Sequence, residues 1–122
     1  MAMYEANQDI YIRQGDTGNM VFTGLPRDKA YDVYFSIYNP DENTIIKELK
    51  ADQFTQSTGI AAFVYDEDFS NSIPVGGWSW ALKICKDGME DTVVPRTYIE
   101  NGKIMQGKIP TFTVDNKVVE GT

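Results

Sequence analysis

The chain has 122 residues, a net charge of −7, no histidine and a single cysteine, Cys85. Its length fits one domain, and its 42% content of hydrophobic residues is high enough to exclude a disordered chain. Because the acidic residues are spread along the sequence, the charge argues against nucleic acid and anionic membranes as partners. We therefore expect one domain over residues 1–122, in which residues 1–7 and 115–122 are candidate flexible or exchanged tails.

Apolar residues alternate with polar ones through most of the chain, which predicts short β-strands. The strand at 78–86 is the clearest, since its even positions hold Trp78, Trp80 and two aliphatic residues. Turn residues separate the strands, and the Asp87-Gly88 pair is typical of a tight hairpin. In chain order, the expected strands cover residues 9–13, 19–23, 31–38, 44–50, 60–65, 78–86, 91–94 and 109–114.

Two segments do not fit this alternation. Residues 66–72 begin with three acidic residues and are followed by Pro74, which predicts a single helical turn. Residues 95–107 allow two structures, an extra hairpin around Asn101-Gly102 or a long ordered loop. The whole pattern predicts an all-β fold, an immunoglobulin-like antiparallel β-sandwich of about 7–9 strands with one short helical turn near residues 66–72.

Few residues offer chemistry. Without histidine, the chain cannot form a Ser-His or Cys-His nucleophile or a histidine-ligated metal site. Cys85 lies between Lys83 and Lys86, which could activate its thiol, but we interpret it as a small, partly buried strand residue. Residues 66–68 are acidic but lack the spacing of a calcium loop, so we interpret them as a helix start. We expect no enzymatic activity, no cofactor and no metal site.

The aromatic residues suggest contact surfaces. Trp78 and Trp80 could form a platform for sugar rings, but their parity with the aliphatic residues of the same strand favours the core. Tyr34 and Tyr38 lie on the less apolar face of their strand and are candidate contact residues for a protein or a sugar. The candidate interaction surface also includes four apolar residues in segments without an assigned strand, namely Tyr98, Ile99, Val118 and Val119.

Several motifs, in order along the chain, resemble those of small β-sandwich domains in tailed-phage structural proteins. Residues 10–18 contain a Gly-Asp-Thr sequence between two expected strands, as in the N-terminal domain of phage baseplate upper proteins. Residues 73–84 resemble that family's Pro-x-Gly-x-Tyr/Trp motif, and residues 107–114 resemble its closing Gly-x-Phe-x-Val strand. The resemblance spans nearly the whole chain.

The resemblance implies a bacteriophage virion structural or accessory protein, such as a head decoration, head-fibre, tail or baseplate component, made in the bacterial host cytoplasm. Its partners would then be other virion proteins, and we expect a homo-oligomer on the particle, without contacts to nucleic acid or membrane. The two terminal segments are candidates for adding a strand to a neighbour's sheet. The alternative is a carbohydrate-binding module for host-surface or environmental glycans, which would require exposed aromatic rings.

Overall fold

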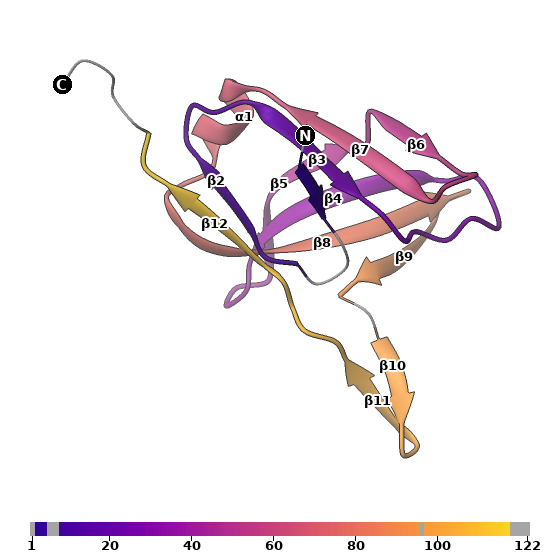
Figure 1. Ribbon diagram of the computed structural model, residues 1–122. Helices are drawn as coiled ribbons and strands as arrows, with labels where there is room; N and C mark the ends of the chain where they lie inside the picture. Colours follow the sequence, from indigo (N-terminus) through magenta and orange to yellow (C-terminus); the bar gives the residue numbers. More distant parts are fainter. Residues whose placement is uncertain (1, 5–7, 96, 118–122) are drawn as a thin grey trace.

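The computed structural model describes residues 2–4, 8–95 and 97–117, which form two packed β-sheets and a separate hairpin (Figure 1). The smaller sheet has the strand order β1 (Ala2–Tyr4), β3 (Gly18–Phe22), β7 (Ile60–Tyr65) and β6 (Gln53–Thr55). The larger sheet has the order β2 (Ile10–Arg13), β12 (Thr111–Asp115), β8 (Gly76–Lys86), β4 (Asp32–Asn39) and β5 (Thr44–Lys50), and β9 (Met89–Val94) also pairs with β8.

This strand order follows the immunoglobulin arrangement, except that β1 and β2 pair in parallel with β3 and β12, where the sequence predicted antiparallel strands only. In that fold, strands A, B, E and D form one sheet, and strands C, F and G form the other, with C′ added in variable-type domains. Here β1, β3, β7 and β6 take the first set of places, while β4, β5, β8 and the pair β9 and β12 take the second. The predicted all-β sandwich is therefore confirmed. The sequence pattern missed β1 and β6, because each is only 3 residues long.

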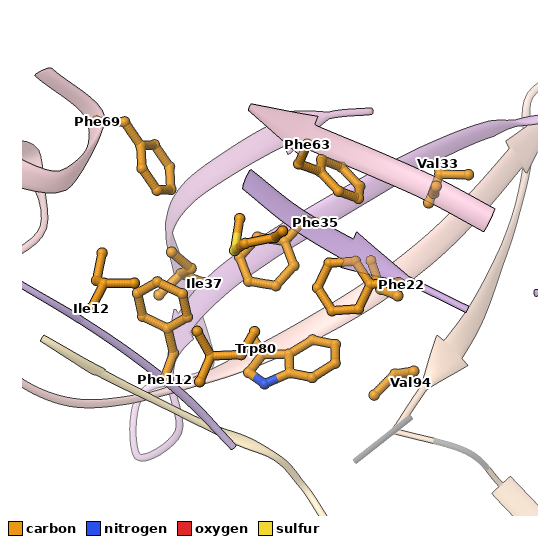
Figure 2. Close-up of a cluster of buried hydrophobic side chains, with 14 of the residues drawn as sticks. Ile12, Phe22, Val33, Phe35, Ile37, Phe63, Phe69, Trp80, Val94 and Phe112 are labelled. Carbon is orange, nitrogen blue, oxygen red and sulfur yellow. The ribbon is translucent and has the colours of Figure 1, made fainter. Parts of the chain in front are cut away.

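Aromatic side chains from both sheets fill the centre of the sandwich (Figure 2). Trp80, Phe35, Phe63 and Phe112 are each 0% exposed, and Phe22 is 1% exposed. The centroid of the Phe35 ring lies 5.6 Å from that of Phe22 and 5.4 Å from that of Trp80. Since each such ring removes about 150–250 Å² from water, this cluster supplies much of the hydrophobic stabilisation of the fold.

A short helix, α1 (Glu67–Ser72), lies where the sequence predicted a helical turn. Asp66 caps it, since the Asp66 carboxylate accepts a hydrogen bond at 2.9 Å from the N–H of the third helical residue. The buried Ser70 hydroxyl accepts a hydrogen bond from Gly15 N at 3.0 Å and donates one to the carbonyl oxygen of Asp16 at 2.8 Å. The helix therefore fixes the Gly-Asp-Thr turn between β2 and β3.

Strands β9 and β12 lie end to end along one edge of β8. β9 pairs with the second half of β8, and β12 pairs with the first half. Together they form one interrupted strand, and a hairpin of β10 (Thr97–Glu100) and β11 (Lys103–Gln106) is inserted at the interruption. Of the two structures that the sequence allowed for residues 95–107, the hairpin is the one formed.

Candidate assembly surfaces

The inserted hairpin, residues 97–106, projects away from the sandwich and is called the arm below (Figure 1). Asn101 and Gly102 have φ angles of 52° and 75°, as a type I′ turn requires at both central residues. This turn sets the register, so that Ile99 and Ile104 face each other across the two strands. Their side chains are 76% and 82% exposed. The arm thus displays a directly opposed pair of isoleucines to solvent.

The arm is anchored at its base, but no other strand or helix of the described residues packs against its two strands. In the described part of the chain, its strands pair only with each other and form a two-stranded sheet. Such a hairpin alone is marginally stable in water, because nothing covers its faces. At the base, Val94 is 3% exposed, and the carbonyl oxygen of Pro110 accepts a hydrogen bond from Trp80 N at 3.3 Å. Exposed apolar side chains on an ordered, anchored hairpin are typical of a site that binds another protein.

A second surface lies on the outer side of β4, where alternate side chains point away from the core. Tyr34 and Tyr38 are half-buried there, and Ser36 between them is 2% exposed. The Ser36 hydroxyl donates a hydrogen bond to Glu48 at 2.9 Å. Ile45 lies opposite Tyr38 on β5 and is 53% exposed. We call this surface the tyrosine face; contact of Tyr34 and Tyr38 with a partner stays a prediction.

A hollow of about 230 Å³ beside β9 is a third feature, called the β9 hollow below. Its apolar lining comes from Tyr31, Ile84 and Met89, and Met89 is 79% exposed. Burial raises the pKa of Tyr31, whose hydroxyl donates to the carbonyl oxygen of Pro26, so this ring is a neutral and fixed part of the wall. The charged lining residues are Asp87, Glu90, Asp91, Lys29 and Lys86.

The two tryptophan side chains of β8 pack against the core of the domain and donate hydrogen bonds to its backbone. Trp80 is fully buried, and its indole N–H donates to the carbonyl oxygen of Gln8 at 3.0 Å. Trp78 is half-buried against the core, and its indole N–H donates to the carbonyl oxygen of Pro74 at 2.9 Å. The prediction of a core position is confirmed for Trp80 and in part for Trp78. Because Trp80 is covered, the two rings cannot form a joint platform for a sugar.

The residues that the sequence offered as candidates for catalysis or metal binding have structural roles in the fold. Cys85 is a half-buried residue of β8, as the sequence predicted. Asp66 is the helix cap, so the interpretation of residues 66–68 as a helix start is confirmed. Within residues 2–4, 8–95 and 97–117, no group of three or more acidic, cysteine or histidine side chains gathers as a potential metal site. Over the same ranges, no helix has the length and apolar character needed to cross a membrane.

Carboxylates fasten β2 to β12 at the outer edge of the larger sheet. The Asp115 carboxylate accepts hydrogen bonds from Asn116 N at 2.7 Å and from the Tyr11 hydroxyl at 3.0 Å, and it lies 3.5 Å from Arg13. These interactions lower the pKa of Asp115, the backbone N–H of Asn116 most, and the same carboxylate raises the pKa of Tyr11.

Asp9 plays the same part at the other end of β12. Its carboxylate accepts hydrogen bonds from Thr111 N at 3.0 Å and from Lys108 Nζ at 3.1 Å. The bond from the Thr111 backbone is the main reason why the pKa of Asp9 is lowered, and Lys108 adds to it. We refer to the contacts of Asp9 and Asp115 as the β2–β12 clasp.

The predicted contact residues are thus divided between surfaces. Ile99 is on the arm, as is the backbone of Tyr98, which pairs with Met105; Tyr34 and Tyr38 are on the tyrosine face. Val118 and Val119 lie outside the described residues.

Sequence reasoning did not place three exposed apolar residues of these surfaces in its candidate surface, namely Ile45, Met89 and Ile104. A signal for Ile104 was present: a two-residue turn at Asn101-Gly102 makes Ile99 and Ile104 cross-strand partners. Met89 follows the other tight turn and carried no comparable signal.

The fold is similar to solved structures of other proteins. The N-terminal domain of phage TP901-1 ORF48 superposes with a TM-score of 0.52 at 12% sequence identity, over 95% of this chain and 95% of that chain. A Group B Streptococcus pullulanase, SAP, matches with a TM-score of 0.50 at 11% identity, over 87% of this chain but 14% of that chain. No protein-family model matches the sequence, and no curated protein does. The predicted resemblance to a phage β-sandwich domain is therefore confirmed, and at these identities it is a likeness of fold.

Proposed function

We propose that this chain is a structural component of a bacteriophage virion that acts by binding other virion proteins. The observation that carries the proposal is the likeness to a phage domain over 95% of both chains. Motifs along the sequence support it independently, from the Gly-Asp-Thr turn to the closing strand. Without histidine, the chain cannot form a Ser-His or Cys-His nucleophile, which favours assembly over catalysis.

The surfaces of the domain suit such a role. An interface of ordinary size covers about 800 Å² on each partner and has an apolar centre within a polar rim. The arm offers Ile99 and Ile104 as an apolar centre, and Glu100 and Lys103 as polar neighbours. The tyrosine face offers a second surface, so one copy can contact more than one neighbour.

The proposal is tested on particles of the phage that carries the gene. We expect an antibody raised against the domain to label gradient-purified particles at a repeated position, and particles lacking the gene to lose that label. The labelled position distinguishes a head decoration, a head fibre, a tail protein and a baseplate component. Purified particles that contain none of the protein, while the lysate contains it, would show that the proposal is wrong.

A carbohydrate-binding module is the second candidate, favoured by the likeness to part of a streptococcal pullulanase. With Trp80 buried, the tyrosine face supplies the aromatic rings for stacking. This function predicts glycan binding that the substitution Tyr34→Ala or Tyr38→Ala abolishes and that Ile104→Ser leaves unchanged. A glycan array on the wild-type protein and the three variants separates the two candidates.

A further inference from the structure

We propose that the arm of one copy docks into the β9 hollow of a second copy, so that identical chains join head to tail. The inference deepens the proposed function, on which it rests, by naming the partner and the two surfaces that meet. Four observations support it: the exposed isoleucines of the arm, the distribution of charge along the chain, the lining of the hollow, and the places of the arm and the hollow in the fold.

The exposed isoleucines of the arm would be stabilised by a partner that removes them from water. Ile99 and Ile104 form one apolar patch, since they are direct cross-strand partners, and both are more than three-quarters exposed. Burial of an aliphatic side chain of this size is among the stronger single contributions to association. A two-stranded sheet also gains order when a second layer covers it. The partner is therefore expected to offer a concave apolar site.

The charge distribution favours a second copy as that partner. Residues 95–110 contain three basic residues and one acidic residue and have a net charge of +2. Since the whole chain has a net charge of −7, the remaining residues have a net charge of −9. Lys108 is engaged by Asp9 at 3.1 Å, whereas Lys103, beside the turn of the arm, has no ion pair with the described residues. The segment that carries the arm is therefore basic, although the arm itself, residues 97–106, holds one glutamate and one lysine. A basic segment is attracted to an acidic body, and another copy supplies one.

The β9 hollow matches the arm in chemistry. Tyr31, Ile84 and Met89 give it an apolar floor for an isoleucine side chain. Its charged lining has three acidic residues, Asp87, Glu90 and Asp91, and two lysines, so it offers partners for both Lys103 and Glu100 of the arm. The tyrosine face lacks this combination, because the hollow beside Tyr34 has no aliphatic residue in its lining, which is completed by Glu48, Lys83, Cys85 and Glu90.

The two surfaces lie at opposite ends of β9. The hollow surrounds the start of the strand, at Met89. The strand ends at Val94, and the arm leaves the sandwich beyond the end of β9 (Figure 1). β9 spans roughly 17 Å at the usual rise of a strand. An arm that projects away from the sandwich at one end does not fold back to the hollow at the other. The contact therefore joins different copies, and a repeated head-to-tail contact closes a ring or extends a chain.

The first test is the association state of the whole chain, measured by sedimentation velocity over a concentration series at low salt. We expect reversible self-association that Ile104→Ser weakens by about tenfold or more. Lys103→Glu is expected to weaken it too, and added salt should do the same to the wild type. Val64→Ser, which removes an apolar side chain 58% exposed on β7, is the matched control and should associate as the wild type does.

A second test identifies the docked surfaces. In a Cys85→Ser background, a protein with Ile104→Cys is mixed with one carrying Met89→Cys and oxidised gently. We expect a mixed disulfide dimer, because a bridge needs Cα atoms within about 7 Å. Mixing Ile104→Cys with Val64→Cys in the same background is the control and should give little product. Unfolding midpoints of all variants show that each one is folded.

Several outcomes would overturn the inference. Wild-type protein that stays monomeric across the series would do so, as would equal weakening by Val64→Ser. An Ile104→Cys protein that dimerises with itself in preference to the Met89→Cys partner would replace the hollow with an arm-to-arm contact. Failure here leaves the virion proposal standing, since particle labelling tests that separately, and self-association of a protein absent from particles would refute the virion role alone.

Discussion

The core of the sandwich and the arm are built from the same kind of strand, yet they differ in what covers them. Phe35 in β4 is 0% exposed and touches four aromatic rings, whereas Ile104 in β11 is 82% exposed. Both residues sit in antiparallel pairs with regular register. The comparison teaches that strand pairing is a local property, while burial depends on what the rest of the molecule places nearby.

The difference also separates stability from binding. Because β9 and β12 continue one strand along β8, the arm is an insertion that leaves the sandwich pairing complete. The free energy of unfolding should then depend on the core, and association should depend on the arm. Four changes break or sharpen this contrast, from the largest expected effect to the smallest.

The largest effect is expected from Phe35→Ala. Removing a fully buried ring from the aromatic cluster leaves a cavity between both sheets and should cost about 3–5 kcal/mol of unfolding free energy. Ile99→Ala on the arm is the matched change and should cost less than about 0.5 kcal/mol. Denaturant unfolding followed by tryptophan fluorescence measures both. Similar losses from the two substitutions would mean that the arm belongs to the cooperative core.

A smaller loss is expected from Gly59→Ala, at the turn between β6 and β7. Gly59 has a φ of +67°, and an added Cβ would lie 2.4 Å from the carbonyl oxygen of Leu25, a backbone atom. We expect a loss of about 1–3 kcal/mol, from the strained backbone angle and the displaced contact. Gly24→Ala is the control, since Gly24 has a φ of +78° but nothing within 4 Å of the added atom. Gly24→Ala should lower the free energy of unfolding less than Gly59→Ala does. Equal losses would show that the contact with Leu25 contributes nothing and that the backbone angle is the whole cause.

Removing the arm should change stability less than either Phe35→Ala or Gly59→Ala. Thr97 and Gln106 face each other at its base, so an Asn-Gly turn can replace residues 97–106 without moving the flanking chain. We expect the unfolding free energy to change by less than about 1 kcal/mol, because no core residue is removed. Calorimetry of the shortened and full-length proteins measures this, and sedimentation of the same samples should show the loss of association. A large drop in melting temperature would contradict the separation of arm and core.

The smallest effect concerns acid pH and the β2–β12 clasp. The hydrogen bonds to Asp115 lower its pKa in the folded protein, so the ionised carboxylate favours folding. This contribution is present above the ordinary pKa of an aspartate and disappears as the pH falls through the lowered value, below about pH 4. We expect the wild type to exceed Asp115→Asn in urea midpoint at pH 7 and the two to converge toward pH 2.5.

Asp41→Asn is the control for the pH series, because Asp41 lies in the exposed β4–β5 turn and has no ion pair with the described residues. Its midpoint should track the wild type at every pH. A gap between wild type and Asp115→Asn that widens in acid would reverse the sign of the clasp's contribution.

Much of the sandwich could be predicted because its strands carry strong alternation. The predicted 78–86 strand became β8, and the predicted strands at 44–50 and 60–65 have the observed bounds. β1 and β6 could not be found, since three residues are too few to show a period of two. The parallel pairing of β2 with β12 was equally hidden, because it joins residues from opposite ends of the chain.

The candidate surfaces were predicted only in outline. Ile99 was found as an apolar residue outside any expected strand, and its partner Ile104 followed from the turn once the hairpin was accepted. The β9 hollow had no signal in the sequence. It combines Tyr31, from before β4, with residues of β8 and β9, and only packing brings these segments together.

The sequence by itself determined the class of fold, the tight turns and the aromatic core, because these depend on residues close to one another along the chain. Alternation of apolar and polar residues favours strands, and Asn-Gly and Asp-Gly favour type I′ turns. Large apolar side chains are buried because their removal from water is favourable. The tertiary structure alone decided which apolar residues stayed outside. Ile84 and Ile104 have the same side chain, but one lies 6% exposed in a sheet with a second sheet behind it, and the other lies 82% exposed on a hairpin with none.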